Sequence, residues 1–240
     1  MPDKRAHRGP HPEDYQLFSL QAVQVLREAY ADYCLLLDRG YPPTATLKLV
    51  GDRHVLKQRQ RVALARCTCS IGQHDERLRR RCDASAVADQ PLWIDGYNLL
   101  TTIEAALSAG VVIVGRDDCY RDMASMHGTY RKVAETVPAI DLIGQTLANL
   151  HIGPCIWYLD RPVSNSGRLA ELIRSRAADQ NWDWQVECVP DPDGVLAQAD
   201  VIIASADSGI LDRCGRWLNL ARKVVSTHLP NAWVVDFRSS

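Results

Sequence analysis

The sequence predicts an α/β protein in which a small basic helical module precedes a Rossmann-like parallel sheet with helices on both faces. Two observations predict this fold. Residues 15–66 carry apolar side chains at three- and four-residue steps, as amphipathic helices do. From residue 91 onward, short continuous apolar runs alternate with helical patterns, which is typical of parallel strands that are covered on both faces.

Composition and apolar pattern divide the 240 residues into four predicted parts. Residues 1–14 are rich in proline and charge and are expected to form a flexible tail. Residues 15–82 are expected to form the helical, basic module, and residues 83–90 a linker. Residues 91–240 are expected to form the α/β domain.

Charge is distributed unevenly along the chain. Residues 1–90 hold 15 Lys and Arg against 11 Asp and Glu, whereas the remaining residues hold 13 against 18. Within residues 51–82 the ratio is 9 to 3. This asymmetry favours a basic arm that meets nucleic acid or another anion, beside an acidic domain.

Several classes of protein are disfavoured by the sequence. No apolar run approaches the roughly 20 residues that a membrane span needs, and the amino terminus lacks the apolar core of a signal peptide. We therefore expect a cytoplasmic protein without a membrane partner, whose eight cysteines are free thiols. Zinc is not favoured, because the spacing of Cys67, Cys69, His74 and Cys82 does not follow the usual paired pattern.

The helical module is predicted to contain a long helix over 15–39, a short helix that ends at Gly51, and a basic third helix. A helix, a glycine turn and a basic helix resemble a helix-turn-helix, so Arg59 and Arg61 are predicted to contact nucleic acid. The alternative is a small bundle whose basic face is merely solvated. Residues 67–90 are predicted to be a connector.

The α/β part is predicted element by element from its apolar runs and its helix caps. Strands are expected at 92–95, 111–114, 155–159, 184–189, 201–205, 223–226 and 233–237. Helices are expected at 98–109, 138–150, 167–179, 193–199 and 208–221. Residues 116–136 are expected to be a loop with irregular helical structure.

Carboxylates follow five of the predicted strands at the point where each ends: Asp95, Asp117 and Asp118, Asp160, Asp191 and Asp193, and Asp207. Because the carboxyl ends of parallel strands share one edge, these acids are expected to gather there. Gathered carboxylates repel one another unless a divalent cation holds them, and all-oxygen sites suit Mg²⁺ or Mn²⁺.

We assign the predicted roles as follows. Asp95, Asp160 and Asp207 are predicted to be catalytic, and Asp95, Asp118, Asp193 and Asp207 to hold the metal. Asp193 is equally well interpreted as a helix cap.

Polar loops at the same edge are predicted to bind phosphate. The expected contacts are Asn98, Arg116, Arg161, Ser164, Asn165, Ser166, Arg168, Ser205 and Ser208. The alternative for the loop after residue 160 is an ordinary capped connection. Residues 120–132 are polar, aromatic and basic and are predicted to cover the site as a lid, in which His127 is more simply structural.

Two stretches resemble known prokaryotic families. Residues from about 33 to 66, with LLLDRGYPPTATLKLVGDRHVLKQRQRVALAR, resemble domain of unknown function 434. Residues from about 91 to 230, with IDGYNLL, YLDRPVSNSGRLAELI and ADVIIASADSGILD, resemble domain of unknown function 5616. Neither resemblance implies an activity.

A remoter likeness is to PIN-like and NYN metal-dependent ribonucleases. It is carried by Asp95-Gly96-Tyr97-Asn98 and by Ser205-Ala206-Asp207-Ser208. The likeness implies a catalytic role for Asp95 and Asp207 and suggests Asp193 as a further acid. The sequence departs from the pattern at Ala206, where a glycine is common, and in having only Glu104 as an acid in the first helix of the domain.

The function that these residues favour is a metal-dependent nuclease, with RNA favoured as substrate, whose helical module binds nucleic acid. The first alternative is a non-catalytic nucleic-acid-binding or regulatory protein with a degenerate nuclease fold. The second is a small-molecule phosphohydrolase that uses the same acidic edge.

Overall fold

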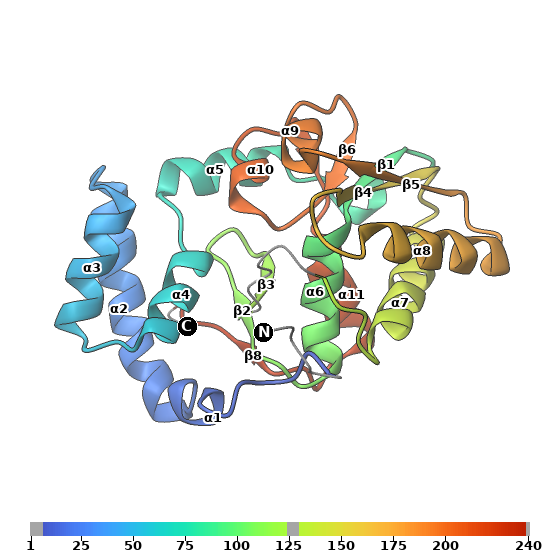
Figure 1. Cartoon of the computed structure of the whole chain (residues 1–240). Coiled ribbons are helices and arrows are strands. Elements are labelled where there is room, and N and C mark those ends of the chain that lie inside the picture. Colours follow the sequence, from blue (N-terminus) through green and yellow to red (C-terminus); the bar gives the residue numbers. More distant parts are fainter. Residues whose placement is uncertain (1–6, 124–129, 239–240) are drawn as a thin grey trace.

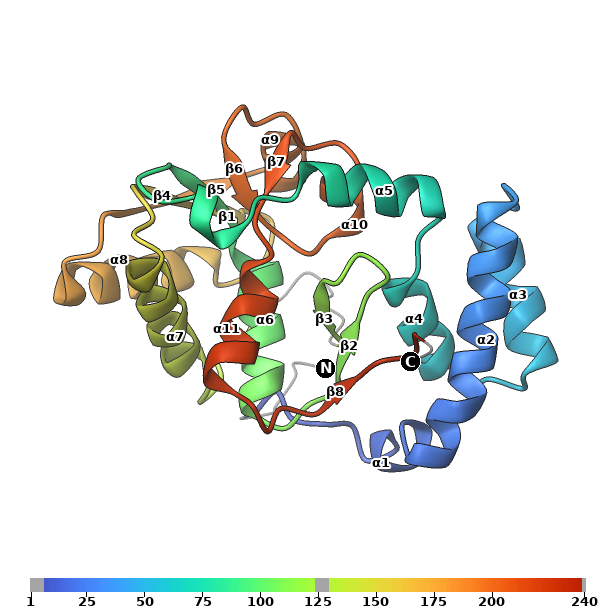
Figure 2. The same cartoon turned by 180° about the vertical axis from the view of Figure 1, so that it is seen from behind.

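The computed structural model describes residues 7–123 and 130–238, in which a helical region precedes two β-sheets (Figures 1 and 2). The helical region contains α1 (Asp14–Leu17), α2 (Leu20–Asp38), α3 (Pro43–Arg53), α4 (Gln58–Cys67) and α5 (Ile71–Arg80). Both views place α2 and α3 at one end of the molecule and α7 and α8 at the other, with the second sheet between them. The predicted order of a helical part followed by an α/β part is confirmed.

The main sheet has five parallel strands in the order β5-β4-β1-β6-β7. Its strands are β1 (Leu92–Asp95), β4 (Cys155–Asp160), β5 (Trp184–Val189), β6 (Ile202–Ala204) and β7 (Arg216–Trp217). β1 is central, and Asp95 at its end lies beside Tyr158 of β4. The carboxyl ends of β1, β4 and β6 therefore meet at one edge, as predicted.

Helices cover both faces of this sheet. One face packs on α6 (Gly96–Leu107), α7 (Thr136–Asn149), α8 (Ser166–Gln180) and α11 (Leu220–His228), and the other on α9 (Pro192–Ala197) and α10 (Ser208–Leu211). Neighbouring strand residues alternate between the two cores: Ile94 and Trp157 belong to the first, Trp93 and Tyr158 to the second. The predicted α/β class, with helices on both faces of a parallel sheet, is confirmed.

A second, three-stranded sheet has the order β3-β2-β8. Its strands are β2 (Val112–Val114), β3 (Tyr120–Asp122) and β8 (Val234–Val235). The apolar run of β2 was expected to place it in the main sheet, and this expectation is wrong. β2 is instead buried between two cores, with Val112 in the core of the main sheet and Ile113 in that of the helical region. A strand that is buried on both faces has a continuous apolar run in whichever sheet it lies, so this pattern could not show which sheet contains β2.

Three other predicted elements are corrected. Residues 223–226, expected as a strand, lie in α11, where the adjacent Val224 and Val225 are both buried against the core. The expected helix over 208–221 is divided into α10, β7 and the start of α11, and the expected connector contains α5 and the short helix η1 (Ala84–Ala86). In each case packing in the folded chain outweighs the local pattern.

The helical region shares a core with the second sheet. Leu26 of α2 and Leu64 of α4 are fully buried in a cluster that also contains Ile113 and Phe237. Residues from the far end of the chain thus complete the core of the amino-terminal helices. None of the helices among the described residues is long and apolar enough to cross a membrane.

The amino-terminal segment is packed where it is described, although it was expected to be a flexible tail. Asp14 is fully buried and forms an ion pair with Arg59 of α4. Arg8 donates from Nε to Glu104 Oε2 of α6 at 2.5 Å, and its guanidinium lies 5.3 Å from the centre of the Tyr130 ring. Residues 7–14 therefore tie the helical region to the α/β part.

Helix α5 is anchored to the α/β part by Arg77, whose side chain is only 1% exposed. Arg77 Nη1 donates to Asp117 Oδ2 at 2.6 Å, and its Nε donates to Asp212 Oδ1 at 2.7 Å. Asp117 also accepts two hydrogen bonds from Arg121. Burial by itself would raise the pKa of Asp117, but the ion pairs with Arg121 and Arg77 hold that pKa well below its usual value.

Replacing Arg77 with Met is expected to lower the free energy of unfolding by about 3 kcal/mol. The reason is that the buried carboxylate of Asp117 loses one of its two arginine partners. Urea denaturation measures the change. The matched control is Arg79→Met on the same helix, since Arg79 is exposed and, in the described part of the chain, forms an ion pair with Glu76 of the same helix. This variant is expected to leave the urea midpoint nearly unchanged. Equal costs for the two variants would contradict the anchoring role of Arg77.

Candidate active site at the carboxyl edge of the main sheet

A pocket of about 650 Å³ lies at the carboxyl edge of the main sheet. Five acids line it: Asp122 of β3, together with Asp95, Asp160, Asp193 and Asp207. The last four follow β1, β4, β5 and β6, so the structure brings together the acids of four of the five predicted strand ends. Helix α4 of the helical region contributes Ala65 and Arg66 to the lining.

Asp95 is the most buried of the four acids that follow strands of the main sheet, with 8% of its surface exposed. It caps α6 by accepting a hydrogen bond from the backbone N–H of Asn98 at 3.3 Å, and its Oδ2 accepts one from Ser205 Oγ at 2.7 Å. Burial raises its pKa to about 7; the Ser205 hydrogen bond opposes this shift, and the charges of Asp193 and Asp207 add to it. Asp95 therefore exchanges its proton near neutral pH.

Asp207, the N-cap residue of α10, lines the same pocket. Its Oδ1 accepts hydrogen bonds from the backbone N–H groups of Gly209 and Ile210 at 2.8 and 3.1 Å. Its own N–H donates to Ser205 Oγ at 3.0 Å, so one hydroxyl connects Asp207 to Asp95. The second carboxylate oxygen of Asp207 takes no part in the cap.

Asp193 and Asp160 complete the acidic group. The cap of α9 is Asp191, whose Oδ1 accepts from the N–H of Gly194, so the interpretation of Asp193 as the cap is wrong. Burial raises the pKa of Asp193, and the charges of Asp207, Asp191 and Asp160 add to the shift. Asp160 Oδ1 is buried and has no hydrogen-bond partner among the described residues.

The loop that carries Asp207 is held from two sides. Asn98 Oδ1 accepts a hydrogen bond from the N–H of Ala206 at 2.9 Å, and Arg121 Nε donates to the carbonyl of Ala206 at 2.7 Å. Asn98, predicted to bind phosphate, is thus occupied in positioning this loop. Ser208 lines the pocket, as expected at this edge, and its Oγ lies 3.5 Å from Arg77 Nη1.

Sequence reasoning missed other residues that line the pocket. On α6 these include Tyr97, Thr101 and Thr102. Both threonine hydroxyls donate to Asp122 Oδ2, at 3.0 and 3.2 Å. Tyr97 and Thr101 are four residues apart and share one helix face with Asn98 and Thr102, so the helical period after Asp95 was the signal that could have found them.

Asp118 does not join the acidic group, because it follows β2, which lies in the second sheet. Its carboxylate accepts hydrogen bonds from Arg81, Arg222 and Arg238 at 3.1, 2.9 and 2.5 Å. Its expected place beside Asp95 is therefore wrong. Arg116, in the same turn, forms a two-point ion pair with Asp38.

The loop after β4 is largely occupied in its own structure. Arg161 donates to the carbonyl of Cys188, Asn165 to that of Tyr130, and Ser166 to that of Arg161. Ser164 and Arg168 are exposed. None of these five residues is among those that line the 650 Å³ pocket.

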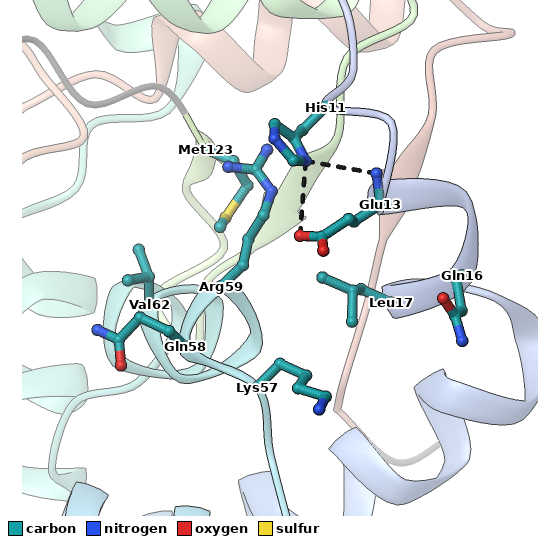
Figure 3. Close-up of a pocket in the computed structure, with 9 residues that line it drawn as sticks. All are labelled: His11, Glu13, Gln16, Leu17, Lys57, Gln58, Arg59, Val62 and Met123. Atoms are coloured by element: carbon teal, nitrogen blue, oxygen red, sulfur yellow. Dashed lines mark hydrogen bonds and ion pairs between the residues drawn. The ribbon is translucent and has the colours of Figure 1, made fainter.

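The two arginines predicted to bind nucleic acid on α4 form ion pairs within the helical region. Arg59 pairs with the buried Asp14, and Arg61 Nη2 donates to Asp52 Oδ1 at 2.8 Å. Arg59 also lines a separate pocket of about 500 Å³ between α1 and α4, where its side chain lies beside that of His11 (Figure 3). The expected phosphate contacts of Arg59 and Arg61 are thus replaced by ion pairs.

The predicted lid is described only in part. Tyr120–Asp122 forms β3 of the second sheet and lies against α6. Residues 124–129, which include His127, lie outside the described residues.

The fit of a divalent cation depends on charge and on unpaired oxygens. Within residues 7–123 and 130–238, no group of three or more His, Cys, Asp or Glu side chains is arranged to hold a metal ion. Mg²⁺, however, commonly uses one or two carboxylates and completes its shell with water and substrate phosphate. Asp95 and Asp207, with the unpaired Oδ1 of Asp160 nearby, fit a cation bound in this open manner.

The fold and the pocket define a class: an α/β protein with an acidic pocket at the carboxyl edge of a parallel sheet. Residues 84–223 match a family described as Domain of unknown function (DUF5616), and residues 25–80 match Protein of unknown function (DUF434). The first match covers more than half of the chain, so the protein belongs to the DUF5616 family.

Comparison with individual proteins adds one relative. An uncharacterized protein of Methanocaldococcus jannaschii is 29% identical over 186 residues, which are 78% of this chain and 88% of that protein. No solved structure matches the chain. The predicted resemblance to the two families is confirmed, whereas the likeness to PIN-like and NYN nucleases stays a prediction.

The raised pKa of Asp95 predicts a specific pH dependence of stability. The pKa of Asp95 is 3.8 in the unfolded chain and about 7 in the folded chain. Between these two pH values the folded chain binds a proton that the unfolded chain does not. The stabilisation that this proton gives to the folded state is therefore lost as the pH rises through about 7. For Asp95→Asn, the free energy of unfolding relative to wild type should rise by about 3 kcal/mol from pH 5 to pH 8.

Urea denaturation in EDTA at several pH values tests this expectation. The control is Asp200→Asn, because Asp200 is exposed and directly precedes β6 at its amino end. A difference between Asp95→Asn and wild type that does not change with pH would contradict the raised pKa.

Proposed function

We propose that this protein is a metal-dependent phosphodiester hydrolase that acts on nucleic acid, with RNA as the favoured substrate. The observation that carries the proposal is the buried Asp95, whose pKa is raised to about 7 by burial and by the nearby Asp193 and Asp207. Three carboxylates so placed favour the binding of positive charge at the carboxyl edge of a parallel sheet. An acidic pocket of about 650 Å³ in front of them has room for a nucleotide-sized group.

The carboxylates of Asp95 and Asp207 would hold the divalent cation, with Asp193 adding negative charge at the mouth of the pocket. A bound Mg²⁺ or Mn²⁺ supplies positive charge to a phosphodiester and lowers the pKa of a coordinated water. Asp95 has a proton to lose near neutral pH, so cation binding would displace that proton.

Proton transfer is assigned to Asp160. Its Oδ1 accepts no hydrogen bond from the described residues, and its side chain is half-buried in the wall of the pocket. A carboxylate has two oxygens, so one can accept a proton from an attacking water while the other accepts a hydrogen bond from the substrate. Ser205 and Asn98 serve this chemistry indirectly, because they fix the positions of Asp95 and Asp207.

The helical region supports a nucleic-acid substrate in a different manner from the one expected. Arg66 of α4 lines the acidic pocket, with 34% of its side chain exposed. Its Nη1 donates to the carbonyl of Asp122 at 2.7 Å and lies 3.7 Å from Asp122 Oδ1. A guanidinium in the wall of this pocket is suited to a phosphate that enters it. The helical region would therefore bind substrate through the pocket rather than through Arg59 and Arg61.

One observation favours the alternative of a non-catalytic nucleic-acid-binding protein. Among the described residues, no three potential ligands are arranged around one point for a metal ion. A protein that had lost the cleavage activity would keep the pocket and the Arg66 guanidinium that lines it. Activity and binding are therefore measured together.

Labelled single-stranded RNA is expected to be cleaved in the presence of Mn²⁺ or Mg²⁺. Asp95→Asn and Asp207→Asn are each expected to lower the rate about a hundredfold or more, because each removes a charge that the transition state requires. Gel analysis of the products gives the rates, and Asp200→Asn is the matched control.

The outcome distinguishes the candidate functions. Binding of RNA without cleavage in either metal would refute the enzyme and favour the non-catalytic protein. Hydrolysis of nucleotide monophosphates without cleavage of the polymer would favour a small-molecule phosphohydrolase instead.

A further inference from the structure

Two buried polar atoms in the wall of the acidic pocket have no hydrogen-bond partner in the described parts of the chain. They are the hydroxyl of Tyr97 and Oδ1 of Asp160. Tyr97 is 6% exposed, and both residues line the pocket. A buried polar atom without a partner costs roughly 1–3 kcal/mol, so such atoms in a pocket wall indicate that a ligand completes them.

The fold explains why both residues line the same pocket. Tyr97 follows Gly96 at the start of α6, and Asp160 ends the neighbouring strand β4. A Cβ atom at Gly96 would lie 2.6 Å from Leu159 Cδ2 and 3.1 Å from the carbonyl oxygen of Tyr158. Glycine at this position therefore allows α6 to begin directly against the end of β4.

The two atoms offer complementary hydrogen-bonding chemistry. The phenol hydroxyl of Tyr97 can donate a hydrogen bond. The carboxylate oxygen of Asp160 offers an acceptor. A group that accepts one hydrogen bond and donates another satisfies both atoms, and a hydroxyl is such a group.

We propose that Tyr97 and Asp160 form a subsite for a ribose 2′-hydroxyl, which accepts from Tyr97 Oη and donates to Asp160 Oδ1. This inference rests on the proposed function and adds to it the means by which the pocket distinguishes RNA from DNA. The 2′-hydroxyl is the group that lets a protein make this distinction. A deoxyribose would leave both buried atoms unpaired, so DNA would bind more weakly.

The test uses fluorescence anisotropy with labelled single-stranded RNA and DNA of matched base sequence and with the corresponding 2′-O-methyl RNA. Ca²⁺ replaces Mn²⁺ and Mg²⁺, since its larger and more flexible coordination shell is suited to binding measurements without rapid cleavage. The wild type is expected to bind RNA about tenfold more tightly than DNA or 2′-O-methyl RNA. Tyr97→Phe is expected to lower RNA affinity to that of DNA and to leave DNA affinity unchanged.

A matched control makes the same chemical change on the other face of the sheet. Tyr158 lies in β4 and packs on Trp93, with ring centres 5.0 Å apart, in the core opposite that of Ile94. Tyr158→Phe should keep the wild-type preference for RNA. Asp160→Asn, which keeps the shape of the side chain, should reduce the ratio of RNA to DNA affinity and gives a second readout if Tyr97→Phe does not fold.

The results separate this inference from the proposed function. A preference for RNA that survives both Tyr97→Phe and Asp160→Asn would overturn the subsite, since the two atoms would then be satisfied by water alone. An equal loss of RNA and DNA affinity in Tyr97→Phe would also overturn it and would assign Tyr97 a structural role. Failure of the wild type to bind either RNA or DNA would overturn the proposed function itself.

Discussion

The arrangement of the acidic pocket depends on the burial of the Asp95 carboxylate at the junction of β1 and α6. This one side chain caps a helix, accepts a hydrogen bond from Ser205 beyond the neighbouring strand, and has a pKa of about 7. Burying a carboxylate is costly unless a proton or a cation compensates its charge. The fold therefore maintains a buried carboxylate that binds a proton up to about neutral pH. Under the proposed function, a divalent cation would replace that proton.

A second buried charge determines how the helical region joins this site. Asp117 accepts hydrogen bonds from Arg77 of α5 and from Arg121 of β3, and Arg121 also holds the carbonyl of Ala206 beside Asp207. The family match that ends at residue 80 includes Arg77, whereas the match that begins at residue 84 includes Asp117 and Arg121. The two family regions are thus interdependent in this chain: one supplies a cation that the loop of the other requires.

The nucleic-acid prediction illustrates the limit of charge counting. The excess of arginine in residues 51–82 is real, but Arg59 and Arg77 form ion pairs with acids that are distant in the sequence, and Arg61 pairs with Asp52 in the same segment. The net charge of a segment cannot reveal such pairs, because it does not show which carboxylate each arginine contacts in the folded chain. Arg66 was not singled out, yet it is the arginine of α4 that lines the acidic pocket.

The sequence by itself determined the α/β class, the central strand with Asp95 at its end, and the grouping of Asp95, Asp160, Asp193 and Asp207. These follow from local periodicity and from the rule that parallel strands end at a common edge. Only the tertiary structure decided that β2 belongs to the second sheet, which removed Asp118 from the group, and that Tyr97 lines the same pocket as Asp160. The reason is physical: an apolar run shows that a strand is buried, but its partners are chosen by packing between segments far apart in the chain.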